Sequence, residues 1–475
     1  MTTRRSACIF RTMKFRIEKD SLGNVNVPET GLYGAQTVRA LENYQISGRT
    51  AHPELIRAYL FLKKSAAEAN LSSGVLPKAL AEKIARAVDE LLLRESEWPQ
   101  IFPVDPYQAG AGTSQNMCIN EVIANVANGY EGAPLGTYAP IHPNDHVNCS
   151  QSTNDTFPTA MRIALLFASK SLESEIRALS ESFLRKSKQW MTIPKSARTH
   201  LQDAVPMTLG QEFSGYGETL AKVADWVTFS REQLRVLGIG GTAAGTGINA
   251  PKNYRNSIVG ALSKNTGEKL ISASNLFEAM QSQSPVGLYS SMMRLMATEL
   301  TRICNDLRLL ASGPMTGLAE INLPAVQPGS SIMPGKVNPS ILEMANQAMF
   351  SVIGYDQTIS QCLMAGQLEL NVMMPMMVYS ALEATRISTR AVKTLREKCV
   401  DGLEPNEEKL KHYFESTPQI ATALSPLLGY EKTAELVKEA LKNGVSVVSL
   451  IKERNLIPAT ELEKLLNITA LTSAH

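Results

Sequence analysis

The sequence predicts a mainly α-helical fold with a central bundle of long helices. Its 475 residues exceed the length of one ordinary domain and can bury a substantial core. After Ser171, apolar residues recur at spacings of four, three and four, so they share one helix face; they are Leu172, Ile176, Leu179 and Phe183. A second run extends from Met207 to Leu237, and about thirty helical residues span roughly 45 Å. Helices of this length with apolar stripes favour a bundle.

The segments on either side of the bundle predict shorter elements. Between Lys14 and about Pro140, turn-rich pieces alternate with helices, one after Pro53 and one over 77–94. From about Gly402, prolines punctuate short charged helices. The chain is therefore expected to divide into a disordered extension (1–13), an N-terminal domain (14–140), a central helical domain (141–399) and a small C-terminal helical domain (400–475). The extension loosely resembles a transit peptide because it holds three arginines and no acid; a short disordered segment is the simpler interpretation.

The composition excludes several classes of function. Forty-seven Lys and Arg balance 45 Asp and Glu, and aromatic residues are only 6%, so no basic field or stacking platform is predicted for nucleic acid or an anionic membrane. No apolar run reaches the roughly 18 residues of a membrane span. The six cysteines are scattered without CxxC or zinc-ligand spacing. We therefore expect reduced thiols, a cytoplasmic location, and neither a metal nor another cofactor.

Four polar segments marked by glycine or proline interrupt the helical pattern. They comprise residues 110–116, 150–156, 197–203 and 328–339. The first two have short hydroxyl and amide side chains ahead of helical stretches, which is typical of helix N-termini. Free N–H groups and the helix dipole at such ends favour an anion. Each alone fits an ordinary N-cap, but two of them, with Lys336 in the fourth segment, favour a small dicarboxylate ligand.

The other two segments hold further candidates. His200 lies in the polar run Arg-Thr-His-Leu-Gln-Asp, where either a structural or a functional histidine could stand. The segment 328–339 contains two serines after Gly329 and is punctuated by proline and glycine. We expect it to form a definite loop, mobile enough to close over a substrate.

Rival motifs fail on spacing or context. The stretch from Gly329 to Lys336 is one residue too long for a phosphate-binding GxxxxGK loop, and Val337 stands where Ser or Thr is required. Gly245 and Gly247 match a loose GxGxxA, but no strand is predicted ahead of them and no βαβ pattern around them. HExxH and GxSxG are absent from the sequence. Cofactor-free chemistry is what remains.

Together, the four segments resemble the aspartase/fumarase family of elimination enzymes. The most specific match is GSSIMPGKVNP at 329–339, which is similar to that family's signature loop. Nearly the whole chain takes part; further matching stretches are RIEKDSLG (16–23), LYGAQTVRALENY (32–44), IHPNDHVNCSQSTNDTFPTAMRIA (141–164), ARTHLQDAVPMTLGQEFSGY (197–216), GTAAGTGINA (241–250), NDLRLLASGP (305–314) and GQLELNV (366–372). The resemblance implies three domains, a bundle that forms the core of a homotetramer, and active sites each shared among three subunits.

Segments of the sequence are similar to two kinds of enzyme in this family, which catalyse different reactions. GAGTS at 110–114 and AGQLELNVM at 365–373 are similar to aspartases, whereas SQSTNDTFPTAM at 150–161 leans towards fumarases. The resemblance therefore implies an ammonia-lyase, which reversibly eliminates ammonia from L-aspartate in the anti sense to give fumarate. A class II fumarase, forming fumarate and water from L-malate, is the alternative.

Matching positions imply roles for individual side chains. Ser330 is expected to be the catalytic base, acting as an alkoxide, and Lys336 to bind the α-carboxylate. His200 is expected to act beside them. The β-carboxylate becomes an aci-carboxylate dianion in the transition state, so donors must be aimed at it. The expected substrate-binding set is Thr113, Ser114, Ser152, Thr153, Asn154, Thr199, Ser331 and Asn338. Glu343 matches the carboxylate that pairs with this histidine in fumarases.

Four positions depart from the family pattern. They are Ala109 and Ala197, where glycine is common, Cys118, where asparagine is usual, and Met315, where arginine is usual. The departures leave open harmless changes beside the site, an altered substrate, weakened activity, or a non-catalytic member of the family.

Overall fold

The structure is a computed structural model that describes residues 14–472. The predicted extension 1–13, with Cys8, lies outside the described residues. The chain forms two compact units. The first unit comprises the residues up to Lys170 together with Thr228–Met293 and Gly354–Arg386. The second comprises Ser171–Val227, Arg294–Ile353 and the residues from Ile387 onward.

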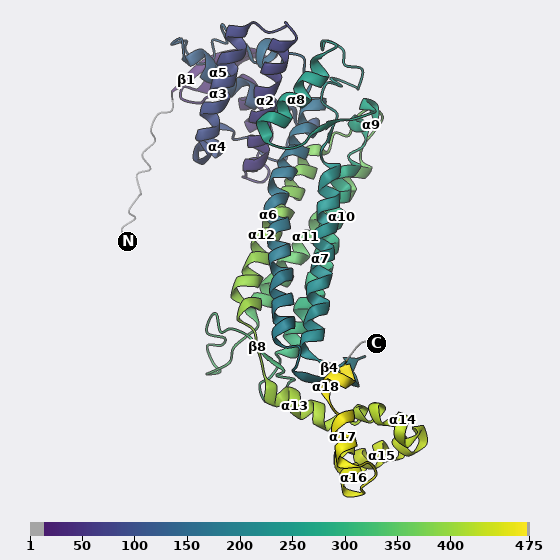
Figure 1. The fold of residues 1–475 in the computed structure, drawn as a ribbon. Helices are drawn as coiled ribbons and strands as arrows, with labels where there is room; N and C mark the ends of the chain where they lie inside the picture. Colours follow the sequence, from purple (N-terminus) through teal and green to yellow (C-terminus); the bar gives the residue numbers. More distant parts are fainter. Residues whose placement is uncertain (1–13, 473–475) are drawn as a thin grey trace, which may run out of the picture. The chain divides into compact units, whose positions relative to one another are not determined.

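Five long helices confirm the prediction of a mainly helical chain (Figure 1). They are α6 (Thr153–Gln189), α7 (Leu209–Gln233), α10 (Ser284–Leu310), α11 (Ser340–Met364) and α12 (Met374–Lys398). Each contributes residues to both units. The four residues of the predicted stripe after Ser171 lie on α6 and are all buried. In the second unit, the ring of Phe183 on α6 packs against Phe213 and Tyr216 on α7, with ring centroids 5.8 and 5.7 Å away.

The remaining helices of the first unit are shorter. They are α1 (Ala35–Asn43), α2 (Pro53–Ser72), α3 (Lys78–Leu93), α4 (Trp98–Ile101), α5 (Thr113–Gly129), α8 (Tyr254–Thr266) and α9 (Leu276–Gln281). The two predicted helices are confirmed as α2 and α3. Pro53 occupies the first position of α2, where its missing N–H costs nothing, and the His52 side chain caps the helix by accepting from Glu54 N.

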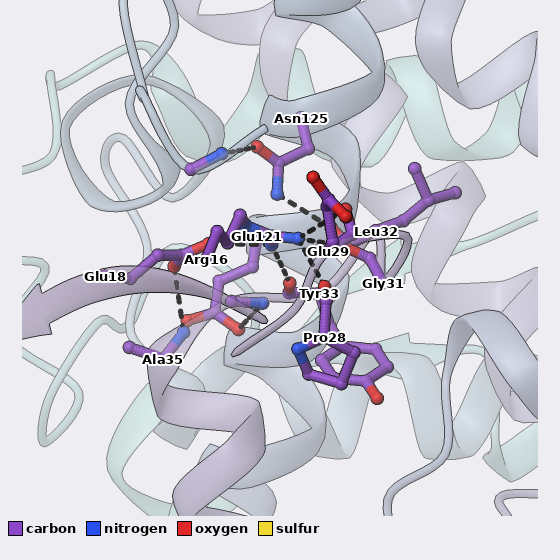
Figure 2. Close-up of polar contacts among 12 residues, drawn as sticks. Arg16, Glu18, Pro28, Glu29, Gly31, Leu32, Tyr33, Ala35, Glu121 and Asn125 are labelled. Carbon is purple, nitrogen blue, oxygen red and sulfur yellow. Dashed lines mark hydrogen bonds and ion pairs between the residues drawn. The ribbon is translucent and has the colours of Figure 1, made fainter. Parts of the chain in front are cut away.

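A polar network holds the first described strands of the first unit (Figure 2). Strands β1 (Phe15–Asp20) and β2 (Gly23–Pro28) pair as an antiparallel hairpin. Arg16 donates to the carbonyl oxygens of Pro28 at 2.7 Å and Tyr33 at 2.7 Å. The α1 N-terminus has no cap of its own; Glu121, from α5, accepts from its first N–H groups, including Gly34 N at 2.9 Å. Burial raises the pKa of Glu121, and these hydrogen bonds oppose the rise. The hairpin and α1 are thereby tied to α5.

The second unit contains a hairpin and a group of short helices. Strands β3 (Pro194–Thr199) and β4 (Gln202–Thr208) pair antiparallel, as do β7 (Ile321–Asn322) and β8 (Glu404–Pro405). The terminal helices are α13 (Glu407–Ser416), α14 (Ser425–Leu428), α15 (Tyr430–Asn443), α16 (Val447–Glu453), α17 (Ala459–Leu465) and α18 (Ile468–Thr472). Helices α14 to α17 share a small apolar core of their own. The prediction of short helices after Gly402 is confirmed.

Two expectations about local structure were wrong. The central segment 141–399 is less uniformly helical than expected, because β3 and β4 fill part of it, and the run from Met207 to Leu237 is helical only over Leu209–Gln233. A strand does precede Gly245: β5 (Val236–Leu237) pairs parallel with β6 (Ile271–Ser272) on either side of α8. The glycines still do not open a helix, since α8 begins only at Tyr254, so the geometry of a dinucleotide site is missing.

Two findings bear on the predicted class of protein. Of the helices within residues 14–472, none combines the length and apolar character that a membrane span requires. The five cysteines in the same range are all free thiols; they are Cys118, Cys149, Cys304, Cys362 and Cys399.

Candidate active site

The GAGTS segment forms a sharp entry into α5 in the first unit. Ala111 and Gly112 both have positive φ, 58° and 80°, and the Ala111 N–H donates to Val372 O at 2.9 Å. A Cβ on Gly112 would lie 1.9 Å from the Phe157 ring. Only glycine therefore fits that position. The turn leaves Thr113 exposed and Ser114 half-buried in the first turn of the helix.

The second polar segment begins α6 with a reciprocal cap. Ser152 Oγ accepts from Asn154 N at 3.2 Å, and Ser152 N donates to Asp155 Oδ1 at 3.0 Å, which is a capping box. Asp155 Oδ2 also accepts from the N–H groups of Gly240 and Thr242, at 3.0 and 2.9 Å. Burial raises the pKa of Asp155 to about 7 against the effect of these hydrogen bonds. The half-buried side chains of Ser152–Asn154 thus start a helix that is held to the 240–242 backbone.

The side chain of Asn116 joins the two helix starts, and its Oδ1 accepts from Thr156 Oγ1 at 3.4 Å. Asn116 Nδ2 on α5 donates to Thr153 Oγ1 on α6 at 3.1 Å. The structure therefore confirms that both segments are helix N-termini and brings them to one place in the first unit. Ser114 also lines a cavity of about 560 Å³, together with Arg39 and His142. Carboxylate binding by these residues stays a prediction.

Thr199 and His200 lie at the tip of the β3–β4 hairpin in the second unit. Thr199 pairs with Gln202, so His200 and Leu201 form a two-residue loop with φ of 55° and 60°. Both values match a type I′ turn. Positive φ is rare for a residue such as leucine, so the turn carries strain. The side chains of Thr199 and His200 are exposed.

Buried ion pairs anchor the base of this hairpin. Lys195 Nζ lies 2.6 Å from Glu212 on α7 and 2.9 Å from Glu320, and Arg198 lies 2.6 Å from Glu320. Lys195 and Glu320 are almost completely buried. Burial raises the pKa of Glu212, and Lys195 opposes the rise. The end of the hairpin opposite its exposed tip is therefore fixed to α7.

The segment 328–339 forms the predicted loop, between β7 and α11 of the second unit. Asn338 Nδ2 donates to Gly329 O at 2.5 Å and closes its neck. A Cβ on Gly329 would lie 1.8 Å from Lys336 O, so the two arms approach too closely for any side chain. Ser330 Oγ accepts from the N–H groups of Ile332 and Met333, at 3.3 and 3.0 Å. Two N–H donors favour the anionic form of that oxygen.

The remaining candidates of the second unit lie on this loop or in the first turn of α11. Ser331 and Lys336 are exposed. Glu343, in the first turn of α11, lies 3.9 Å from Arg308. Its expected pairing with His200 stays a prediction.

The four departures occupy different environments. Cys118 is fully buried, which raises the pKa of its thiol. Ala109 accepts from Gly112 N at 3.1 Å and so shapes the entry to α5. Ala197 lies at a register irregularity in β3. Met315 is 84% exposed, and nothing in the chain explains its identity.

Sequence reasoning missed the buried polar groups beneath these segments. Asp155 could have been found, because Ser-x-x-Asp before an apolar run is the signature of a capping box. Lys63, Asn116 and Asn148 also lie beneath the start of α6. No sequence signal separates a buried lysine such as Lys63 from a solvated one on a helix.

Known proteins are similar in sequence to nearly the whole chain. Residues 23–354 match the family model described as Lyase, and residues 420–473 match the one described as Fumarase C C-terminus. An aspartate ammonia-lyase from a Bacillus species is 44% identical over 457 residues, which cover 96% of this chain and 97% of the relative. The chain belongs to the aspartase/fumarase family of lyases. An aspartate ammonia-lyase from Helicobacter pylori is 43% identical over 462 residues, covering 97% of this chain and 98% of the relative.

Solved structures of the aspartase/fumarase family share the fold. The crystal structure of a fumarate lyase:delta crystallin from Brucella melitensis has a TM-score of 0.93 and 42% identity, covering 97% of this chain and all (100%) of that chain. A class II fumarase from Schistosoma mansoni has a TM-score of 0.91 and 33% identity, covering 96% of this chain and 98% of that one. The expected fold class is therefore confirmed.

Proposed function

We propose that this chain is an aspartate ammonia-lyase that converts L-aspartate reversibly to fumarate and ammonia. The observation that carries the proposal is the level of identity: 44% to an aspartate ammonia-lyase over 457 residues, against 33% to a fumarase of known structure. The GAGTS entry to α5, which is similar to aspartases, supports the same choice. The substrate is a small dicarboxylate in either case.

The proposed chemistry begins at Ser330. Its alkoxide removes a proton from the carbon beside the β-carboxylate, and the N–H groups of Ile332 and Met333 stabilise the charge on Oγ before transfer. The electron pair of the broken C–H bond moves into the β-carboxylate, which becomes an aci-carboxylate dianion. When that intermediate collapses, the C–N bond breaks and ammonia leaves from the opposite face.

The other side chains hold the substrate in this proposal. Lys336 pairs with the α-carboxylate, and His200 acts beside the amino group. The proposed donors to the β-carboxylate are Thr113, Ser152, Thr153 and Ser331. The proposed contacts around the amino group and α-carboxylate are Asn154, Thr199 and Asn338. Ser114 contributes to the binding set, and Glu343 orients His200.

The proposed active enzyme is a homotetramer with active sites shared among subunits. The candidate side chains divide between the two units, with Thr113 and Ser152–Asn154 in the first and the hairpin and loop residues in the second. A site built from several copies would bring such sets together. The three-domain division and the cytoplasmic location stay predictions of the same kind.

A class II fumarase is the second candidate. The segment at 150–161 leans towards fumarases, and the Schistosoma mansoni fumarase shares the fold. An ultraviolet assay for fumarate, run with L-aspartate beside L-malate, separates the two. Fumarate from L-aspartate supports the ammonia-lyase, fumarate from L-malate alone supports the fumarase, and turnover of neither favours the non-catalytic alternative.

A further inference from the structure

The first unit holds a buried lysine that the proposed mechanism does not use. Lys63 on α2 is completely buried. Its ammonium group donates to Asn148 Oδ1 and Gln151 Oε1, both at 3.0 Å. No carboxylate within residues 14–472 lies at ion-pair distance from it, and burial lowers its pKa to about 7, against the opposing charge of Asp155. Burying an ammonium without a paired carboxylate is costly, so the position demands a reason.

A chain of hydrogen bonds connects this lysine to the start of α6. Asn148 Oδ1, which accepts from Lys63, also accepts from Asn116 Nδ2 at 3.2 Å. The same Asn116 nitrogen lies 3.1 Å from Thr153 Oγ1. Asn116 is 1% exposed, so these contacts are shielded from water. Two amide side chains thus link Lys63 to a side chain proposed to bind the β-carboxylate.

In its ammonium form, Lys63 fixes the direction of the bonds in this chain. An ammonium can only donate, so the Asn148 atom that faces it is the oxygen. That oxygen can only accept, so Asn116 must present its NH₂ group to it. The two protons of this NH₂ group go to Asn148 and Thr153, and the Thr153 oxygen is therefore an acceptor. Among the described residues 14–472, the Thr153 hydroxyl donates no hydrogen bond, and its one bond is the one that it accepts from Asn116. That proton remains available to an oxygen of a ligand.

We propose that Lys63 is a positioning residue that, through Asn148 and Asn116, fixes the Thr153 hydroxyl as a hydrogen-bond donor to the substrate's β-carboxylate. The inference rests on the proposed function, because it assigns Thr153 a carboxylate. A donor whose direction is set before the reaction stabilises developing charge without reorganisation. Lys63 touches no substrate in this account and acts only through Thr153.

The test is a double-mutant cycle between Lys63 and Thr153. The variants are Lys63→Met, which fills the same space without donors, Thr153→Val, and the two combined. Lys64→Met is the matched control, because Lys64 is the next residue of α2 and pairs with Asp89 at 2.6 Å instead. Steady-state kinetics of fumarate formation from L-aspartate give kcat and KM, and thermal unfolding reports on the fold.

Lys63→Met should lower kcat roughly tenfold or more, with a smaller change in KM, because the donor matters most as charge develops. Lys64→Met should keep the wild-type kcat. In the Thr153→Val background, Lys63→Met should cause less than about a twofold further loss. The same fold loss in both backgrounds would overturn the proposal, since it would show that Lys63 acts on the structure at large.

A second variant covers the case in which Lys63→Met does not fold. Asn116→Asp keeps the side-chain shape but presents an oxygen to Thr153, so the hydroxyl must donate to it and lose its free proton. Its kcat should fall about as far as that of Thr153→Val. Wild-type kcat in Asn116→Asp would contradict the proposal.

Binding of succinate, measured by calorimetry, separates a failure of this inference from a failure of the proposed function. Succinate offers two carboxylates but cannot react. If the wild-type protein forms no fumarate from L-aspartate, yet Lys63→Met weakens succinate binding only while Thr153 is present, then the proposed reaction alone is wrong. If L-aspartate turns over but Lys63→Met lowers kcat by the same factor in the wild-type and Thr153→Val backgrounds, then the role of Lys63 alone is wrong. A wild-type protein that neither binds succinate nor turns over L-aspartate contradicts both.

Discussion

The two units hold their candidate residues in opposite ways. In the first unit, Thr113 and Ser152–Asn154 lie in or immediately before the first turns of α5 and α6, and buried polar groups hold those turns. In the second unit, Ser330 and Lys336 lie on a loop whose own hydrogen bonds close its neck and turn, and most of its side chains are exposed. The first arrangement favours a fixed geometry and the second favours movement.

This difference matches two separate demands of the proposed reaction. Donors to a developing dianion contribute most when they are oriented before the charge appears. A loop that carries the base must open to admit a substrate and close to exclude water. The rigid helix starts therefore suit the donors, and the exposed loop suits the base. Variants in the two regions should change activity and stability in different ways.

The largest effect on activity is expected from the loop. Ser330→Ala should lower kcat by roughly 10²- to 10⁴-fold, because it removes the proposed base. The unfolding midpoint should stay unchanged, since the loop contributes little buried surface. Ser351→Ala, an exposed serine on α11, is the control. A near-normal kcat in Ser330→Ala would show that Ser330 is not the catalytic base.

A large effect on stability is expected from a substitution at the start of α5. Gly112→Ala combines a positive φ of 80° with a clash against Phe157, and we expect a loss of about 2–4 kcal/mol in the free energy of unfolding. Gly132→Ala separates the two causes, because its φ is 73° and no atom lies within 4 Å of the added Cβ. Denaturant titration should show a clearly smaller loss for Gly132→Ala. Equal losses would mean that the packing against Phe157 is unimportant.

A smaller effect, on binding, is expected from Lys336→Ala. Loss of a charged partner for the α-carboxylate should raise KM for L-aspartate roughly 10- to 100-fold. Lys432→Ala, on an exposed face of α15, should leave KM unchanged. An unchanged KM in Lys336→Ala as well would exclude the carboxylate role.

The last expected effect is a pH dependence of stability at the start of α6. Burial raises the pKa of Asp155 to about 7 from its ordinary 3.8. Between these values the folded chain keeps a proton that the unfolded chain releases, so rising pH favours the unfolded state. The unfolding free energy of the wild-type protein, measured relative to Asp155→Asn, should therefore fall as pH rises from about 4 to about 7. A difference that stays constant across this window would show that Asp155 is ionised in the fold throughout.

Local signals in the sequence predicted the rigid helix starts well. The Ser152 side chain accepts from the backbone next to it at the start of α6, so its pattern can be interpreted without knowledge of the fold, whereas the start of α5 has no side-chain cap. The loop 328–339 was also predictable, because proline and glycine prevent a helix there. The helices α2, α3 and the stripe of α6 followed from periodicity in the same way.

Features that depend on tertiary packing could not be predicted. The β3–β4 hairpin turns at His200 and Leu201, which carry none of the usual Asn-Gly signal of such turns. Lys63 is polar on a helix, and only the packing of α2 against its neighbours reveals that it is buried. The ion pair between Lys195 on β3 and Glu320 joins residues more than a hundred positions apart.

The assay of purified protein for fumarate tests the central claim most directly. Absorbance at the ultraviolet band of fumarate would be followed with L-aspartate and, in parallel, with L-malate. The account predicts fumarate from L-aspartate, with loss of the signal in Ser330→Ala. Fumarate from L-malate alone would contradict it and identify a fumarase.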